Sequence, residues 1–312
     1  MTVSQKTNRS ENEAANQEET VLVEEQETQA SFEQISHETT LFAEPIFHFG
    51  NFTITNSLLN SWLVLIIILI SALIIGKKIK KIPSGIQNYL EIIFEGALNL
   101  ADSVTGSRQK SLKFIPVVLP LFFFILLNNW LGLLPGVGSI GFIEGQGAEK
   151  IFVPLLRGAT ADLNTTLALA ILAVIITHIF GVIMAGAWSH LNRFIGLQLI
   201  LEIPKKVFKE KEYTAILVNP IKFFVGLIEL VGELAKVASL SFRLFGNIFA
   251  GEVLLGAMAA IFAYILPIPF MFLEIVVGLI QALIFAMLTL VFLTVMTTSH
   301  EESENNHQVV AH

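Results

Sequence analysis

Residues 239–252 read SLSFRLFGNIFAGE and place an arginine, Arg243, inside a long apolar segment. That segment starts at Asn219-Pro220 and has no further proline before Pro267. A guanidinium keeps its proton in proteins, and placing it at the centre of a membrane helix costs at least ~2.5 kcal/mol. Ionisable residues at such depth usually serve a function, so we predict a functional role for Arg243. The alternative is a structural charge that has a partner in a neighbouring helix.

The composition is that of a membrane protein. Of 312 residues, 54% are hydrophobic and only 14% are charged, which lies outside the range of soluble globular domains. There are no cysteines, and the seven histidines lack metal-ligand spacing, so we expect no disulfide, metal centre or cofactor. The sequence contains no GxxxxGK[ST] loop, which excludes a P-loop site for ATP, and we expect no catalytic residue and no nucleic-acid partner.

The composition also divides the chain into three parts. Residues 1–45 are rich in Glu, Gln, Asn, Ser and Thr and predict a disordered acidic N-terminal tail. This tail has neither the basic start nor the short apolar core of a signal peptide. Residues 46–300 form the predicted membrane channel domain, and residues 301–312 form a short polar cytoplasmic tail.

Five apolar segments are long enough to cross a bilayer. They cover residues 58–75, 114–134, 163–188, 220–266 and 267–298. The fourth would be roughly 70 Å long as a helix, more than twice the hydrocarbon thickness, so it must be broken, bent or steeply tilted. The mixed pattern of residues 84–106 predicts an interfacial helix. The predicted fold is an all-α integral membrane protein with about five spans, the last two forming a long tilted hairpin.

Clusters of cations predict the orientation of the spans. Lysines end the first apolar segment at Lys77 to Lys81, and four more lie between Lys205 and Lys211. Cations beside a span favour the cytoplasmic side. With five alternating spans, the N-terminus is predicted outside and the C-terminus in the cytoplasm.

The fourth segment carries a polar face. At 100° per residue, its polar side chains return to one side of the helix. These residues are Glu229, Glu233, Lys236, Arg243 and Asn247. Glu252 lies half a turn away from Arg243 and ~13 Å further along the axis. For Glu229, Glu233 and Lys236, mutual charge balance without a further function is an equally good explanation.

The predicted hairpin pairs polar residues across its two helices. In an antiparallel hairpin, Glu252 faces Glu274 and Arg243 faces Gln281, and the two pairs agree in register to within two residues. Two carboxylates would then lie nearer the outside, with a fixed cation and an amide deeper in the membrane. We predict that Glu252 and Glu274 form one site.

The stretch SLSFRLFGNIFAGE resembles the signature of subunit a, the stator channel subunit of the rotary ATP synthase membrane sector. The resemblance extends from ITNSLLNSWLVLI at Ile54, through ATADLNTTLALA at Ala159, to GLIQALIFAMLTLVFL at Gly278. It implies that the long hairpin faces a rotor ring. Only the acidic tail and parts of the loops fall outside it.

The resemblance implies a role for each polar position. Arg243 would face the c ring with Asn247 beside it and Gln281 nearby. Glu252 and Glu274 would line the outer half-channel, and Glu229 and Lys236 the cytoplasmic one. Asp162 and Asn164 match the polar start of the third span, where helix capping is an equal alternative. Many relatives have histidine at the position of Glu274, which leaves open which of the two glutamates carries protons.

The implied function is proton passage through two offset half-channels to and from the c-ring carboxylates, which drives rotation coupled to ATP synthesis. The permanent charge of Arg243 would block a continuous proton wire between the half-channels. The expected partners are c-ring subunits, the b subunits of the peripheral stalk, indirectly the catalytic sector, and the lipid bilayer of a bacterial plasma membrane.

Two other classes compete with this hypothesis. A self-contained secondary transporter or ion channel would use Arg243 to bind an anion, but it favours internal repeats and broken half-helices, which the sequence does not show. A purely structural scaffold has no use for charges placed in the middle of the membrane.

Overall fold

The computed structural model describes residues 40–50, 52–80, 85–134, 136–144, 151–186, 215–262 and 265–309. The predicted tail up to residue 39 and the predicted basic segment 205–211 lie outside these residues. The described helices are α2 (Asn56–Lys78), α3 (Ile86–Thr105), α4 (Arg108–Leu133), α5 (Leu163–Ala185), α9 (Ala215–Ile261) and α10 (Pro267–Val309). Short elements connect them: β1 (Pro45–Phe49), β2 (Phe52–Thr55), η1 (Val137–Ser139), β3 (Gly141–Glu144), β4 (Ile151–Pro154) and η2 (Ala159–Ala161).

Five of the described helices are long and apolar enough to cross a membrane. The candidate spans are Asn56–Lys78, Arg108–Leu133, Leu163–Met184, Phe224–Ile261 and Pro267–Thr297. The prediction of an all-α integral membrane protein with five spans is therefore confirmed. The two small β-hairpins, in which β1 pairs with β2 and β3 with β4, were not predicted.

Several helices extend beyond their apolar segments. α4 begins at Arg108, six residues before the predicted start, because its first turns carry polar residues that a hydropathy pattern does not count. α9 begins at Ala215, so Asn219-Pro220 does not mark its start as predicted. α10 continues to Val309, well past residue 298. Apolar patterns mark the membrane-crossing part of a helix and not the ends of its hydrogen-bond ladder.

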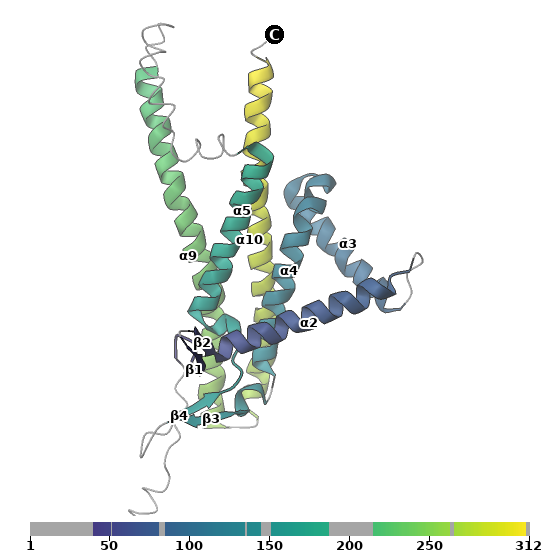
Figure 1. The fold of residues 1–312 in the computed structure, drawn as a ribbon, viewed down its shortest axis with the longest axis vertical. Helices are drawn as coiled ribbons and strands as arrows, with labels where there is room; N and C mark the ends of the chain where they lie inside the picture. Colours follow the sequence, from purple (N-terminus) through teal and green to yellow (C-terminus); the bar gives the residue numbers. More distant parts are fainter. Residues whose placement is uncertain are drawn as a thin grey trace, which may run out of the picture. The chain divides into compact units, whose positions relative to one another are not determined.

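The centre of the helical unit is formed by α4, α5, α9 and α10. α10 contacts α3, α4, α5 and α9, and α5 packs along both α9 and α10 (Figure 1). Their shared core contains Leu121, Ile125, Ala170, Leu240, Leu244 and Phe285. α9 and α10 are continuous over 47 and 43 residues, which confirms the long hairpin.

The helix α3 packs against α4 and α10 through one side. Leu98 and Ala101 are buried there, whereas the opposite side of α3 is exposed. At the start of α4, the exposed Arg108 donates to Glu95 at 2.9 Å and to Asp102 at 2.8 Å, and so ties α3 to α4. The predicted helix of residues 84–106 is therefore present.

Polar contacts connect the spans to one another. Lipid is as apolar as a leucine side chain, so helix association in a membrane depends on close packing and interhelical hydrogen bonds. Asn60 of α2 donates to Asn128 of α4 at 3.2 Å, and Thr166 of α5 lies 3.3 Å from Ser241 of α9. Asn129 of α4 donates to the Gly278 carbonyl of α10 at 2.9 Å.

Two hairpins lie between the helices in sequence. β1 and β2 are antiparallel and lead directly into α2, whose first turn is capped by the hydroxyl of Thr55. β3 and β4 belong to a separate compact unit. Within that hairpin Gly141 pairs with Pro154, and a Cβ atom at Gly141 would overlap the Val153 carbonyl, so the position requires glycine.

Gly132 provides a test of close packing between α4 and η2. A Cβ atom there would lie 2.9 Å from the Cα of Gly158, so the backbone has to shift. We expect Gly132→Ala to destabilise the subunit by about 1–3 kcal/mol, the usual cost of overpacking. The measurement is the thermal unfolding midpoint of the purified complex. Gly96→Ala on α3 is the control, because nothing lies within 4 Å of its Cβ position, and an equal drop in both variants would contradict this packing argument.

Candidate functional site

Arg243 lies at the centre of its span. It is 19 residues after Phe224 and 18 before Ile261, the ends of the fourth candidate span. Its side chain is exposed, and its Nη2 atom donates to Ser239 Oγ at 3.3 Å, one turn earlier on α9. Within the described part of the chain, Ser239 is its one hydrogen-bond partner. The cation is therefore available to a group outside this chain.

A groove runs beside Arg243 between α9 and α10. Its volume is about 270 Å³, and Lys236, Ser239 and Arg243 line its α9 wall. Leu288 and Phe292 of α10 form the opposite wall. Asn247, one turn after Arg243, is exposed as well. The predicted shared face is thus confirmed for Lys236 and Arg243.

A buried acid cluster lies on the N-terminal side of Arg243. Glu233 is 7% exposed, and its carboxylate accepts from Lys236 Nζ at 2.7 Å. The ring nitrogen Nε2 of His178 on α5 lies 3.5 Å from the other carboxylate oxygen of Glu233. Glu229, one turn earlier, is half-buried. His178 was missed by sequence reasoning, although a histidine within the apolar third segment was a visible signal.

Glu274 lies on the other side, where α9 and α10 approach each other. It is 6% exposed, and its carboxyl group lies directly against the backbone of Gly251. A Cβ atom at position 251 would overlap this carboxyl group, so Gly251 provides its space. Among the described residues, Glu274 has no hydrogen-bond or ion-pair partner. Gln281, two turns further along α10, is also buried.

Glu252 has a different environment from Glu274. Its carboxylate forms an ion pair with the Nη2 atom of Arg157 at 2.8 Å. Sequence reasoning missed Arg157, and the only signal was an isolated arginine shortly before the third span. The contact between Gly251 and Glu274 confirms the predicted hairpin register at this level, whereas the pairing of Arg243 with Gln281 stays a prediction. That Glu252 and Glu274 act as one site stays a prediction.

Asp162 caps α5 and connects it to the N-terminal part of the described chain. Its carboxylate accepts from the Asn164 amide at 3.2 Å and from the Thr165 hydroxyl at 3.0 Å. It also accepts from Ser57 Oγ of α2 at 3.0 Å and from the Ala43 amide at 3.3 Å. Helix capping is therefore confirmed for Asp162, which is buried, whereas Asn164 is exposed.

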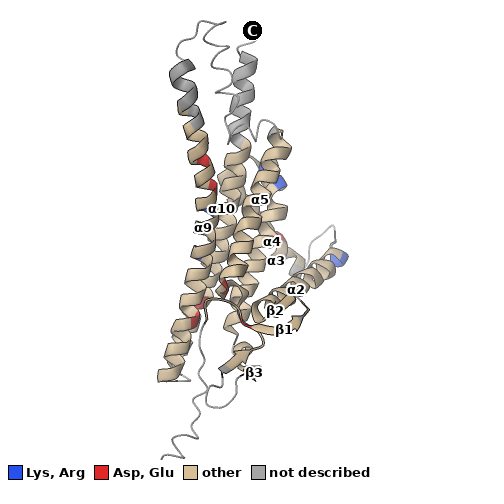
Figure 2. Ribbon diagram, turned by 60° about the vertical axis from the view of Figure 1, so that its left-hand side comes forward, with Lys and Arg blue, Asp and Glu red and all other residues tan. Residues whose placement is uncertain are grey.

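Figure 2 shows the acidic residues of α9 at two levels along the helix. Glu233 precedes Arg243 by ten residues and Glu252 follows it by nine, or roughly 15 and 13 Å along a helix that rises 1.5 Å per residue. Their total separation is close to the ~30 Å hydrocarbon thickness of a bilayer. Two acidic groups thus lie within the span on opposite sides of the arginine.

Comparison with known proteins assigns the family. The family model described as "ATP synthase A chain" matches residues 58–294, which include all candidate site residues. The chain belongs to the ATP synthase A chain family. An ATP synthase subunit a of Geobacter sulfurreducens is 31% identical over 233 residues, which cover 75% of this chain and 83% of the relative. For the subunit a of Moorella thermoacetica, the identity is 28% over 257 residues, covering 82% and 96%.

This membership decides between the hypotheses drawn from the sequence. The chain is a proton-translocating stator subunit of the ATP synthase, and nothing favours the alternative of a self-contained transporter. It is a multi-pass membrane protein and part of the ATP synthase complex.

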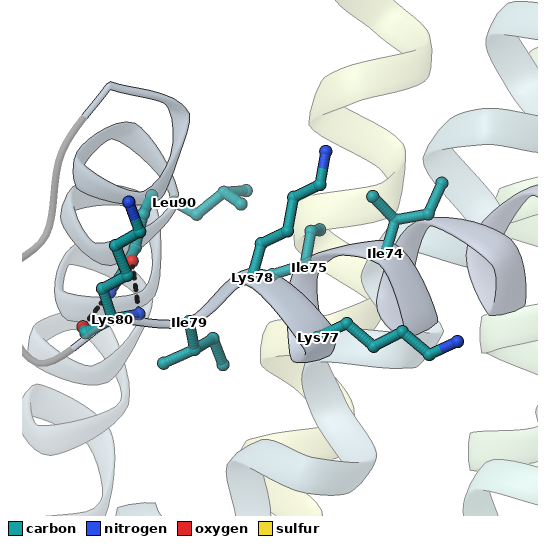
Figure 3. A pocket seen from close by; sticks show the side chains of 8 residues that line it. Ile74, Ile75, Lys77, Lys78, Ile79, Lys80 and Leu90 are labelled. Atoms are coloured by element: carbon teal, nitrogen blue, oxygen red, sulfur yellow. Dashed lines mark hydrogen bonds between the residues drawn. The ribbon is translucent and has the colours of Figure 1, made fainter.

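A second cavity, of about 610 Å³, lies at the end of α2, and none of the candidate site residues is among its described lining residues. It is lined by residues of α2, α3 and the link between them, including Lys77, Lys78 and Lys80. The Gln87 amide holds the link by bonding both the N–H and the carbonyl of Lys80, at 3.0 and 2.9 Å. Figure 3 shows that the side chains of Lys78 and Lys80 point toward the top of the view and that of Lys77 points to the right. The described residues that line this cavity include no carboxylate.

Proposed function

We propose that Arg243 faces the carboxylates of a rotor ring of c subunits. The observation that carries this proposal is an exposed arginine at the centre of a candidate span, with a single serine as its partner in the described chain. An arginine facing lipid at this depth is expensive, so a second protein has to cover it. A carboxylate on a neighbouring helix supplies the matching charge.

The proposed route has two half-channels that are offset along α9. The outer one uses Glu252, Glu274, Gln281, Asp162 and Asn164. The cytoplasmic one uses Glu229, Glu233 and Lys236, and Arg243 with Asn247 separates the two. The burial of Glu233 and Glu274 supports this division, because buried ionisable residues within membrane spans are functional by default.

Proton movement follows from the charge of Arg243. A proton that enters from outside neutralises a rotor carboxylate, which can then turn through lipid. When this carboxylate reaches Arg243, the guanidinium favours its ionised form, and the proton leaves toward the cytoplasm. Each crossing is worth ~2.3 kcal/mol per 100 mV of membrane potential, which drives the rotation.

The proposed assembly and location extend the family assignment. The partners are c-ring subunits and the b subunits of the peripheral stalk, with the catalytic sector contacted indirectly. The membrane is a bacterial plasma membrane, with the N-terminus outside and the C-terminus in the cytoplasm. Lys77 and Lys78 in the last turn of α2 support this orientation. We also propose a disordered tail before residue 40 and a short polar cytoplasmic tail at the C-terminus.

Cysteine cross-linking tests the proposed rotor contact. The chain has no native cysteine, so each introduced thiol is unique. We expect Asn247→Cys, one turn from Arg243, to form a disulfide with a cysteine placed beside the c-subunit carboxylate. Leu69→Cys is the control, because Leu69 is 60% exposed but lies on α2. Cross-linking from position 69 and not from position 247 would show that another face meets the rotor.

A further inference from the structure

Arg157 is an almost fully buried cation at the outer end of the proposed route. Its side chain is 4% exposed. The Nε atom donates to the two carboxylate oxygens of Glu252 at 3.0 and 3.2 Å, and Nη2 donates to one of them at 2.8 Å. The remaining donor capacity goes to the carbonyls of Thr40 at 2.8 Å and Phe42 at 3.2 Å. All three guanidinium nitrogens therefore have partners.

These contacts fix a segment that we call the strap, residues 40–44. Besides Arg157, the strap has two further attachment points. The Ala43 amide donates to Asp162 at 3.3 Å, and the Glu44 amide donates to Asn56 at 3.2 Å. Arg157 thus joins α9 to a segment more than 200 residues away in sequence.

The exposed fractions of the two paired side chains differ. The Glu252 side chain is 29% exposed, whereas that of Arg157 is 4% exposed. The more accessible part of the pair is therefore the carboxylate, and the guanidinium lies behind it. The segments around this pair add acidic groups, namely Glu274 on α10, Asp162 at the start of α5 and Glu44 in the strap. Among the described residues, Arg157 is therefore the buried cation in a region where most of the ionisable groups are acidic.

We propose that Arg157 is a positioning residue of the outer half-channel, which holds the Glu252 carboxylate and the strap in place at the proton entrance. The inference rests on the proposed function, since it assigns Glu252 to the outer route. Arginine suits this task because its planar fork donates to a carboxylate with one edge and to carbonyls with the other. A lysine has a single ammonium and serves only some of these acceptors.

The experiment measures proton-driven ATP synthesis against the pH on the outer side, in vesicles that contain the complete complex. Removing the cation makes the acidic entrance bind protons more strongly. We therefore expect Arg157→Gln to shift the half-saturating proton concentration about tenfold lower, that is, to a higher outer pH. Arg157→Lys should recover part of this shift. Arg108→Gln is the control, because Arg108 of α4 forms ion pairs with Glu95 and Asp102 of α3, and it should leave the profile unchanged.

A double mutant separates positioning from bracing. If Arg157 acts through Glu252, then Arg157→Gln adds little to the shift already present in Glu252→Gln. An unchanged half-saturating pH, with additive losses of assembled complex, would overturn the proposal and leave Arg157 as a brace. Where Arg157→Gln does not assemble, the profile of Arg157→Lys decides by the same criterion. An unchanged pH profile would contradict the role of Arg157 but would not affect the cross-link from position 247. The two experiments therefore distinguish a failure of this inference from a failure of the proposed function.

Truncation tests the strap itself. Deletion of residues 2–39 leaves the Thr40, Phe42 and Ala43 contacts in place and should preserve the pH profile. Deletion of residues 2–44 removes them and should shift the profile in the same direction as Arg157→Gln. Equal profiles for the two truncations would show that the strap has no part in the entrance.

Discussion

Arg243→Lys is expected to abolish ATP-coupled proton pumping in a complex that still assembles. Lysine keeps a positive charge, but its ammonium loses a proton readily when it is buried in a dry interface, whereas a guanidinium does not. Arg243 is exposed on α9 and would become buried in the proposed contact with the rotor. Its permanent charge would then separate the two proposed half-channels.

Arg243→Ala removes the barrier as well as the ion pair. We therefore expect it to abolish pumping and, unlike the lysine variant, to allow passive proton leak through the membrane sector. Asn247→Ala is the comparison, because Asn247 is a neutral neighbour on the same face and should have a smaller effect. Pumping and passive permeability are measured in vesicles that carry each variant. Near-normal pumping by either Arg243 variant would mean that this arginine is a structural charge.

The second large effect is expected at Glu274. The residue is 6% exposed and its carboxyl group has no partner in the described chain, whereas the Glu252 carboxylate is held by Arg157. We therefore expect Glu274 to be the group that exchanges protons at the inner end of the outer route. Positioned proton-transfer groups typically contribute 10²-fold or more, so Glu274→Gln should lower the rate of pumping about a hundredfold.

Gly251→Ala tests the same position without changing the carboxyl group. The new methyl group would overlap the Glu274 carboxyl, whose flexible end can swing away while the helices stay in place. Pumping should fall in Gly251→Ala, and the substitution should add little in a Glu274→Gln background. Gly256→Ala is the control on α9, since nothing lies within 4 Å of its Cβ position. Equal losses in the Gly251 and Gly256 variants would argue against a specific effect on Glu274.

The sequence by itself determined the membrane class, the five spans, the shared face of Lys236 and Arg243, and the capping of α5 by Asp162. These features follow from hydropathy, from the 3.6-residue helical period and from hydrogen bonds between near neighbours, all of which are local properties. The hairpin register near Glu274 was also predictable, because a short connection before Pro267 restricts which residues of α9 and α10 face each other. Local signals were weaker at the helix ends, and α4, α9 and α10 extend beyond their apolar segments.

Only the tertiary structure decided which charges meet across the chain. Arg157 and Glu252 are 95 residues apart, and His178 of α5 meets Glu233 of α9 through helix packing. Neither pairing can be predicted from the spacing of the residues in the sequence, because the loops that join these segments do not fix how the helices rotate against one another. The packed core and the close approach at Gly251 determine that rotation. They also give Glu252 and Glu274 different environments, although the sequence presents them as two similar acids in one hairpin.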